Sequence, residues 1–414
     1  MIDINLIKQN PELIKQGLAK RGVEVDFCDI FEKEEKRKEQ QSKLEQMRAK
    51  RNKVSGEIAK LKQNNEPIAI INAKIHDMQK LGEKIAKVEE KIGKLERKLF
   101  DELSAMPNIP AEDVLPGGKE ANKVIKTQGE KREFEFTPKD HIQLCKDLGL
   151  IDYERGAKMS GSGNWVYRGM GARLEWALLN YFIDFHHKNG YEFILPPHLL
   201  NYESGFAAGQ FPKFADDVFM TEAKFLIPTS ETALINMHRG ENLDRLPIKY
   251  FAQSPCYRKE AGGYGASERG MIRGHQFNKV EMFIFTDAKQ SDEMHAELVK
   301  NAEELMNGLG LHYQTVLLAA GDMGASMAKT YDIEVWIPSM NGYKEVCSAS
   351  NAHDYQARRA NIRFDKQFVH TLNASGLATS RLFPAILEQF QNADGSVTVP
   401  EPLRKYMGGI DRIR

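Results

Sequence analysis

The sequence predicts an α+β protein in which a long antiparallel helical hairpin precedes a domain of antiparallel strands and flanking helices. Three observations lead to this prediction. Residues 27–99 are rich in Lys, Glu, Gln and Arg, and their sparse apolar residues recur every three, four or seven positions. Residues 104–132 contain the Pro- and Gly-rich passages of a linker. After this linker, short aromatic and β-branched runs alternate with amphipathic stretches, as strands and helices do.

Composition limits the class of protein. The chain has 414 residues, enough for two or three domains, and its 58 Lys and Arg balance its 58 Asp and Glu. Net charge therefore does not indicate a polyanionic partner, and nucleic-acid binding would need a local basic patch. We expect no signal peptide and no membrane span, because no run approaches about 20 apolar residues. The four cysteines form no C-x-x-C pair, so we expect a reducing cytoplasmic location and no cysteine zinc site.

The helical hairpin is predicted from two apolar seams. Residues 27–63 would span about 55 Å as one helix. Residues 64–67 end in a proline and break the pattern, and a second apolar run covers 71–99. Two such seams joined by a short turn are typical of an antiparallel coiled coil. The seam positions are Leu44, Met47, Val54, Ile58, Leu61, Ile71, Ile75, Met78, Leu81, Ile85, Val88, Ile92, Leu95 and Leu99.

The first helix of this hairpin is mildly basic. Residues 27–63 contain eleven Lys and Arg against seven Asp and Glu. Each helix has only one apolar stripe, so we expect little else to cover it. The pattern alone favours a spacer or dimerisation coil with a solvated charged face.

Residues 256–283 are the most informative stretch. Both ends are rich in aromatic and β-branched residues, and 261–274 contains five glycines, which together predict two antiparallel strands joined by a loop. Side chains alternate across a sheet, so one surface would collect a guanidinium, an aromatic ring and two carboxylates. Such a surface suits a nucleotide, although a hairpin whose charges only face water is the simpler alternative. The residues are Arg258 and Glu260 on the first strand and Phe277, Lys279 and Glu281 on the second.

The order Arg-x-Glu, glycine-rich loop, Arg-x-His-x-Phe-x-x-x-Glu resembles the second signature motif of class II aminoacyl-tRNA synthetases, and most closely that of the seryl-tRNA synthetases. This resemblance implies a catalytic domain built on an antiparallel β-sheet flanked by helices. It also implies ATP- and Mg²⁺-dependent activation of L-serine to seryl-adenylate. The serine would then be transferred to tRNA(Ser), and the resemblance leaves open whether tRNA(Sec) is a second acceptor.

A strand from Phe225 leads into the triplet Thr229, Ser230 and Glu231. The simplest interpretation is an ordinary helix start, with a hydroxyl as N-cap and an acid near the helix dipole. In the resembling family this triplet holds serine. The same resemblance assigns Glu281 and Ser375 to the serine site. Alanine would be rejected because the hydroxyl's partners would be left unpaired.

Residues 331–338 and 342–348 read as two more strands, and Glu345 is costly in such an apolar run unless it meets a cation. An edge position facing solvent is the alternative. The resemblance assigns Glu345 to the ATP phosphates and, together with Ser348, to Mg²⁺. Cys347 stands where the family usually has Ser, and in a regular strand it would point to the same side as Glu345.

Residues 370–384 resemble the third class II motif, with Ala374 and Ser380 in place of glycines. Arg381, at the start of the following helix, would hold the γ-phosphate. The resemblance thus implies Arg258, Arg381 and Glu345 as catalytic residues. The implied ATP-binding set is Arg258, Lys259, Glu260, Arg273, Phe277, Glu345, Val346, Cys347, Ser348 and Arg381.

The resemblance divides the chain into a tRNA-binding arm domain at 1–103, a linker at 104–133 and a catalytic domain at 134–414. Its first motif, around the Pro-Pro pair at 196–197, implies a homodimer. Two alternatives remain. An amino acid:carrier-protein ligase of the same class would lack the long coiled-coil seam, and a non-enzymatic coiled-coil adaptor would not need the three motifs in order.

Overall fold

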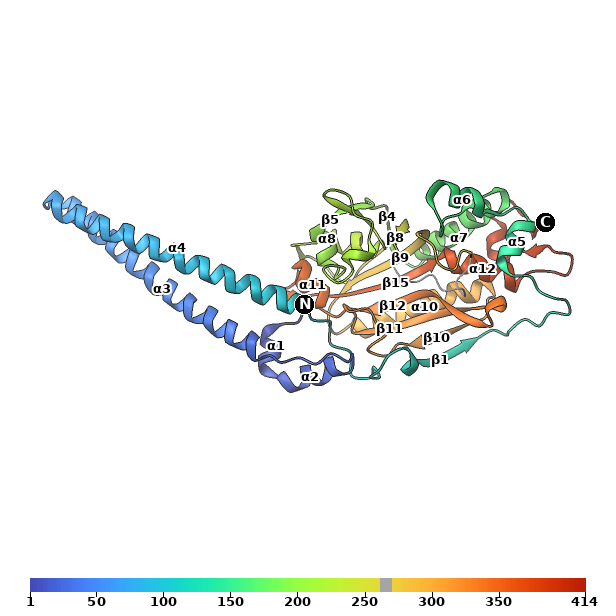
Figure 1. The fold of residues 1–414 in the computed structure, drawn as a ribbon, viewed down its shortest axis with the longest axis horizontal. Coiled ribbons are helices and arrows are strands. Elements are labelled where there is room, and N and C mark those ends of the chain that lie inside the picture. Colours follow the sequence, from blue (N-terminus) through green and yellow to red (C-terminus); the bar gives the residue numbers. More distant parts are fainter. Residues whose placement is uncertain (261–269) are drawn as a thin grey trace. The chain divides into compact units, whose positions relative to one another are not determined.

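The computed structural model describes residues 1–260 and 270–414. Its elements confirm the predicted α+β class, with a long helical hairpin and a mainly antiparallel sheet flanked by helices (Figure 1). The chain forms two compact units. The helical unit contains Ile2–Lys15 and Glu24–Met106, and the sheet unit contains Met1, Gln16–Val23 and Pro107–Arg414. The glycine-rich part of the predicted hairpin loop, 261–269, lies outside the described residues.

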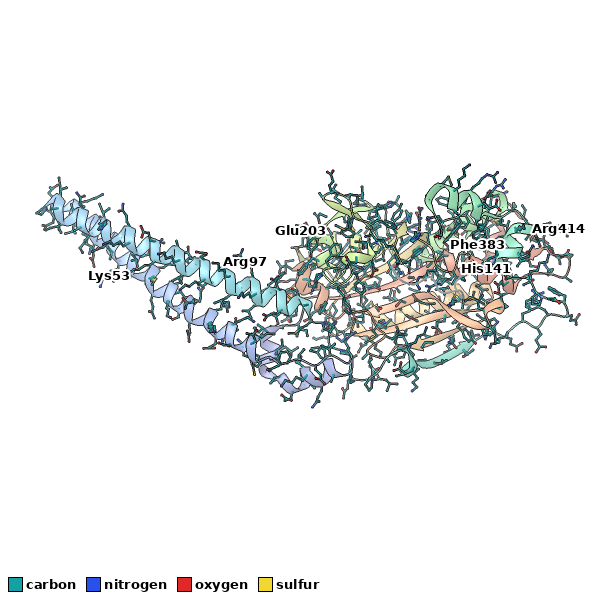
Figure 2. All side chains as sticks on the ribbon, in the orientation of Figure 1. Lys53, Arg97, His141, Glu203, Phe383 and Arg414 are labelled. Carbon is teal, nitrogen blue, oxygen red and sulfur yellow. The ribbon has the colours of Figure 1, made fainter. Side chains whose placement is uncertain are left out.

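The helical unit is dominated by α3 (Cys28–Gln63) and α4 (Ile68–Ala105), preceded by α1 (Ile4–Gln9). The predicted seam is confirmed: Leu44, Ile85 and Ile92 form a buried cluster, with Met47, Leu81 and Val88 packed against it. Polar side chains, such as the exposed Lys53 and Arg97, lie outside this seam (Figure 2). The two helices therefore stabilise each other through one narrow apolar stripe.

The sheet unit is built on eight strands, and every neighbouring pair is antiparallel except β4 and β8. The predicted hairpin corresponds to β8 and β9, in which Cys256 pairs with Phe277. The strand order is β1 (Lys123–Gln128), β10 (Tyr313–Leu317), β11 (Lys329–Ile337), β12 (Gly342–Asn351), β15 (His370–Ala378), β9 (Gln276–Thr286), β8 (Ile248–Tyr257) and β4 (Glu192–Ile194).

Side-chain alternation on β9 separates a core face from a site face. Val280, Met282 and Ile284 belong to the main hydrophobic core together with residues of α7 (Gly169–Lys188), α10 (Ser291–Leu309) and α12 (Thr379–Gln389). The intervening side chains, among them Phe277, Lys279 and Glu281, share the opposite face. The core beneath this sheet therefore fixes the strands that carry the polar residues.

Smaller elements surround the sheet. Strand β1 lies within the predicted linker 104–133 and forms one edge of the sheet, while the neighbouring residues Asn108 and Ala111 bond to backbone groups at 325–328. No helix among residues 1–260 and 270–414 has the length and apolar content to cross a membrane. The other elements are α2 (Pro11–Ala19), α5 (His141–Asp147), α6 (Tyr153–Ser160), α8 (Tyr202–Ala207), α9 (Glu231–Asn236), α11 (Tyr355–Ala360), α13 (Glu401–Arg404), β2 (Ile151–Asp152), β3 (Val166–Tyr167), β5 (Leu199–Asn201), β6 (Lys224–Leu226), β7 (Asn242–Leu243), β13 (Arg363–Phe364), β14 (Gln367–Phe368), β16 (Val397–Thr398), β17 (Arg412–Ile413), η1 (Lys119–Ala121), η2 (Ala215–Asp217) and η3 (Pro338–Met340).

Candidate active site

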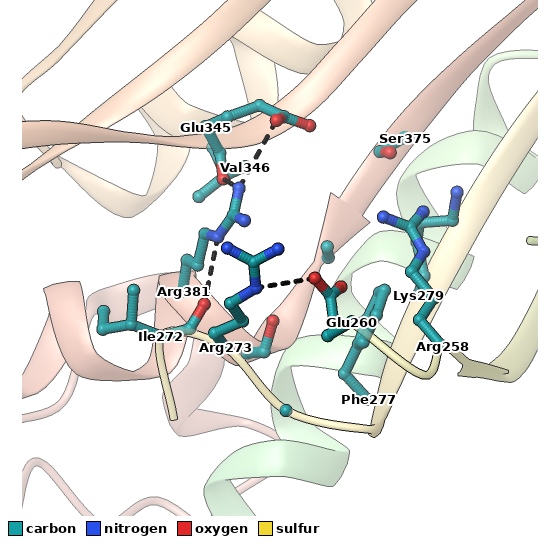
Figure 3. Close-up of a pocket in the computed structure, with 13 residues that line it drawn as sticks. Arg258, Glu260, Ile272, Arg273, Phe277, Lys279, Glu345, Val346, Ser375 and Arg381 are labelled. Carbon is teal, nitrogen blue, oxygen red and sulfur yellow. Dashed lines mark hydrogen bonds and ion pairs between the residues drawn. The ribbon is translucent and has the colours of Figure 1, made fainter. Parts of the chain in front are cut away.

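A pocket of about 50 Å³ lies where β9, β12, β15 and α12 meet the end of β8 (Figure 3). Most of its lining is polar, and it includes three arginines, a lysine and two glutamates. Its lining residues are Arg258, Glu260, Ile272, Arg273, Gly274, Phe277, Lys279, Glu345, Val346, Ser375, Ala378, Ser380 and Arg381.

The end of β8 and the start of β9 supply one wall. The Arg258 guanidinium lies 5.3 Å from the centre of the Phe277 ring, and its Nε donates to the Pro228 carbonyl at 3.3 Å. Arg273 Nε donates to the Glu260 carboxylate at 2.7 Å (Figure 3). Arg258, Glu260 and Phe277 line the same pocket, as predicted, but the prediction that Arg258 and Glu260 lie on the first strand is wrong, because β8 ends at Tyr257. A ring, two guanidiniums and a carboxylate therefore stand together, as nucleotide binding requires.

The opposite wall comes from β12 and α12. Arg381 Nη1 donates to the Glu345 carbonyl at 2.8 Å and lies 3.4 Å from the Glu345 carboxylate, while its Nε donates to the Ile272 carbonyl at 3.2 Å. Both side chains remain partly exposed to the pocket, at 31% for Arg381 and 45% for Glu345. They are available to a ligand because neither is sealed by its own contacts.

The deeper part of the site is a buried polar cluster. Lys279 forms an ion pair with Glu281 and donates to Thr229 Oγ1 at 2.8 Å. Ser375 faces Glu281 across the β15–β9 ladder. Thr229 also lines a second hollow, of about 480 Å³, which shares Arg258, Glu260 and Arg273 with the first. Two hydroxyls, the Lys279 ammonium group and the Glu281 carboxylate thus lie together beside the pocket that holds the arginines.

Glu231 adds a second carboxylate to this cluster. Its side chain is buried, and burial, followed by the charge of Glu281, raises its pKa to about 7. A hydrogen bond of 2.6 Å from Gln356 and the charges of Lys279 and Arg258 oppose this shift. An incoming cation would favour the ionised form.

Several predicted residues do not reach the pocket. Ser230 is fully buried and bonds to Ser254 at 2.6 Å, and Lys259 is tied through its backbone N–H to the Asp217 carbonyl. The expectation that Cys347 shares the face of Glu345 is wrong. The ladder between β11 and β12 is irregular after Ile333, so the register shifts by one residue and Cys347 lies in the hydrophobic core.

The donors suit Mg²⁺, although residues 1–260 and 270–414 contain no cluster of three or more His, Cys, Asp or Glu arranged for a metal ion. Glu345 offers an accessible carboxylate, and Ser348 pairs with Asp332 on the neighbouring strand. Asp332 Oδ1 is buried and has no hydrogen-bond partner within the described ranges. A set of hard oxygen donors with one orphaned atom fits Mg²⁺ better than a softer metal.

Comparisons with known proteins agree with this geometry. Residues 1–110 match the model of the seryl-tRNA synthetase N-terminal domain, and residues 213–390 match that of the class II tRNA synthetase core domain for G, H, P, S and T. The chain is 54% identical to serine–tRNA ligase 2 of Clostridium acetobutylicum over 99% of each protein. It is 47% identical to the serine–tRNA ligase of Thermodesulfovibrio yellowstonii over 100% of each.

The chain belongs to the seryl-tRNA synthetase family. The structure of the Pyrococcus horikoshii seryl-tRNA synthetase complexed with ATP matches it with a TM-score of 0.90 and 35% identity, covering 100% of this chain and 99% of that one. The chain is therefore an ATP-dependent serine–tRNA ligase, which activates serine and transfers it to tRNA. Family membership decides against the carrier-protein ligase and the coiled-coil adaptor.

Two residues of the site were missed by the sequence prediction. Lys279 was placed on the right face but given no role, although the alternation that selected Phe277 and Glu281 also selects it. Gln356, which bonds to Glu231, lies on α11, 125 residues away along the chain. No local pattern links those two positions, so only the fold reveals the contact.

Proposed function

We propose that the pocket around Arg258 binds ATP and that the adjoining buried cluster binds serine. The observation that carries this proposal is the convergence of Arg258, Glu345 and Arg381, from three separate segments, on one pocket. Serine needs no general base, because its carboxylate is already ionised when it attacks the α-phosphorus. Most of the rate enhancement would come from positioning and from stabilising charge on the phosphates.

Arg258 is assigned to the α-phosphate and the serine carboxylate, and Arg381 to the γ-phosphate. Phe277 offers a ring face to adenine, and Glu260 can accept from its exocyclic amine. The Arg273–Glu260 bond at 2.7 Å supports this assignment, because it holds the carboxylate at the pocket wall. Lys259, Val346, Cys347 and Ser348 complete the proposed set; for Cys347 only the backbone can take part, since its side chain is in the core.

Thr229, Glu231, Glu281 and Ser375 are assigned to serine, with Ser230 supporting the triplet through Ser254. The two carboxylates would hold the ammonium group, and Thr229 and Glu281 would hold the hydroxyl. Alanine would leave these buried groups unpaired and would therefore be rejected. Lys279 neutralises one carboxylate, so the cluster keeps one negative charge for the ammonium group.

Mg²⁺ is proposed as the cofactor, held by Glu345 and Ser348. When bound, it would neutralise charge on the ATP phosphates and aid the departure of pyrophosphate. Arg381, which contacts Glu345, would also neutralise charge on the same leaving group.

The functional domains are proposed to be the tRNA-binding arm at 1–103, the linker at 104–133 and the catalytic domain at 134–414. The mildly basic first helix of the arm supports tRNA binding, because phosphates need local positive charge. We propose tRNA(Ser) as the acceptor and tRNA(Sec) as a second acceptor to be tested in the same charging assay. A cytoplasmic location accords with the four free cysteines.

A homodimer is proposed from apolar side chains left exposed near the edge strand β4. Leu195, directly after β4, is 73% exposed. Leu199 and Tyr202 add further apolar surface nearby in the sequence. Large exposed apolar residues that gather along one segment are typical of an interface.

The residue assignments are tested by serine-dependent pyrophosphate exchange. Arg258→Ala should lower the exchange rate by roughly 10³-fold, because a donor that would stabilise charge on the α-phosphate is lost. The matched control is Arg155→Ala, which removes a guanidinium that is 73% exposed, pairs with Asp152 and does not line the pocket. Exchange by Arg258→Ala near the wild-type rate would remove this arginine from the site.

A further inference from the structure

Gln356 makes three hydrogen bonds that join three elements around the buried carboxylate of Glu231. Its Nε2 donates to Glu231 Oε1 at 2.6 Å and to the Ala208 carbonyl at 2.9 Å. Its Oε1 accepts from Thr371 Oγ1 at 2.6 Å. Gln356 and Thr371 are both fully buried. The side-chain amide therefore has every hydrogen it can donate in use, and one orientation is fixed.

The three partners come from different parts of the sheet unit. Ala208 caps the C-terminal end of α8, and Glu231 is the first residue of α9. Thr371 lies on β15, the strand that also carries Ser375. Gln356 itself lies on α11. One amide thus ties the carboxylate to a helix end and to the strand that carries another residue of the pocket. A carboxylate held in this way is positioned before any ligand arrives.

We propose that Gln356 is a positioning residue for serine recognition, which holds the Glu231 carboxylate in place and in its ionised form for the substrate ammonium group. The inference rests on the proposed serine-binding role of Glu231. It adds a residue that touches no substrate and acts through its neighbour.

The charged groups around Glu231 determine the expected pH dependence. Glu281 and Lys279 face it from β9, and Arg258 faces it from the end of β8. Glu281 disfavours its ionisation, whereas the two cations and the Gln356 hydrogen bond favour it. Without Gln356, the Glu231 pKa rises further. A larger fraction of the enzyme then lacks the negative charge near neutral pH, and serine binding weakens most at the acidic end.

Gln356→Met keeps the length of the side chain and removes all three hydrogen bonds. We expect the KM for serine at pH 7 to rise by at least about tenfold, since a charge-assisted hydrogen bond is lost, with the KM for ATP unchanged. The pH at which the serine kcat/KM falls to half should move upward. Thr371→Val removes only the hydrogen bond that Gln356 Oε1 accepts. It should raise the KM for serine and the half-maximal pH by smaller amounts.

The matched control is Gln389→Met. Gln389 is also buried and bonds to the Trp336 carbonyl at 2.8 Å and the His312 N–H at 3.0 Å, but it does not line either hollow of the site. Gln389→Met should lower the thermal stability of the protein without changing the pH dependence of kcat/KM for serine. If Gln356→Met fails to fold, Thr371→Val decides the question by the same profile.

Two results separate the inference from the proposed function. If Glu231→Gln leaves the KM for serine unchanged, the assigned role of Glu231 is wrong. If Glu231→Gln raises this KM but Gln356→Met and Thr371→Val keep the wild-type pH profile, Gln356 is only structural and the inference is overturned. Equal rises in the KM for serine and for ATP would overturn it as well.

Discussion

The helical unit and the sheet unit use charge in opposite ways. In the helical unit, Arg48 and Glu89 pair across α3 and α4 at 2.8 Å while each side chain stays more than two-fifths exposed. In the sheet unit, the paired side chains of Lys279 and Glu281 are 6% and 2% exposed. Water screens the first pair and not the second. The charges of the arm pair therefore stay solvated, whereas the charges of the buried pair depend on each other for stabilisation.

The largest expected effect comes from removing Mg²⁺ or its proposed ligand. Chelation with EDTA should abolish pyrophosphate exchange, and Glu345→Ala should lower it by on the order of 10²–10³-fold while raising the Mg²⁺ concentration for half-maximal rate. The physical reason is that charge on the leaving pyrophosphate would stay uncompensated.

Glu334→Ala is the control, because Glu334 pairs with Glu345 across the ladder but does not line the pocket and accepts a hydrogen bond from Gln314 at 2.7 Å. Calorimetric measurement of ATP binding at increasing Mg²⁺ concentrations checks the assignment. An unchanged Mg²⁺ requirement in Glu345→Ala would place the metal elsewhere.

The next effect separates the two units. Replacing residues 29–102 with a short Gly/Ser linker should leave serine-dependent exchange at the wild-type rate but raise the KM for tRNA by about 100-fold at moderate salt, because backbone phosphate contacts are lost. The bases of the helices lie together, since Lys33 bonds to Glu102 at 2.5 Å, so a short linker can join them. Charging assays with tRNA(Ser) measure the change. An unchanged KM would make the arm a spacer.

The sequence predicted the helical hairpin and the strands better than the contacts within the buried polar cluster of the site. The seam through Leu44 and Ile85 follows from local spacing, and the β8–β9 faces follow from alternation. The shift in register that places the Cys347 side chain in the core could not be predicted from residues 342–348, because the irregularity depends on pairing with β11. The bond between Gln356 and Glu231 likewise depends on tertiary packing of four elements.

A buried carboxylate should affect stability where an exposed one does not. Burial raises the pKa of Glu175 to about 7, although Asn278 and Thr379 donate to it at 2.8 and 2.7 Å. The ordinary value in an unfolded chain is about 4.3. The folded state therefore binds a proton that the unfolded state releases, and stability falls as pH rises between these two values.

In Glu175→Gln this pH dependence is absent. The Tm of the variant minus the Tm of the wild type should therefore increase between pH 5 and pH 8. This increase corresponds to about 2–3 kcal/mol in unfolding free energy. Glu89→Gln, at the exposed arm pair, is the control for the loss of a glutamate side chain. Calorimetric melting at several pH values checks both, and a flat curve for Glu175→Gln would mean that this side chain is not charged and buried at pH 8.

The smallest effect is expected in the arm itself. A double-mutant cycle with Arg48→Ala and Glu89→Ala should give a coupling energy of about 0.2–1 kcal/mol, because both side chains are nearly half exposed and lose rotational freedom when they pair. Chemical denaturation of the four proteins measures it, and added salt should lower it further. The matching cycle with Lys279→Met and Glu281→Gln, in the buried pair, should exceed it several-fold, since each single change leaves the other charge buried without its partner. Equal coupling in the two cycles would contradict the contrast between a solvated arm and a desolvated site, because it would mean that water screens the two pairs alike.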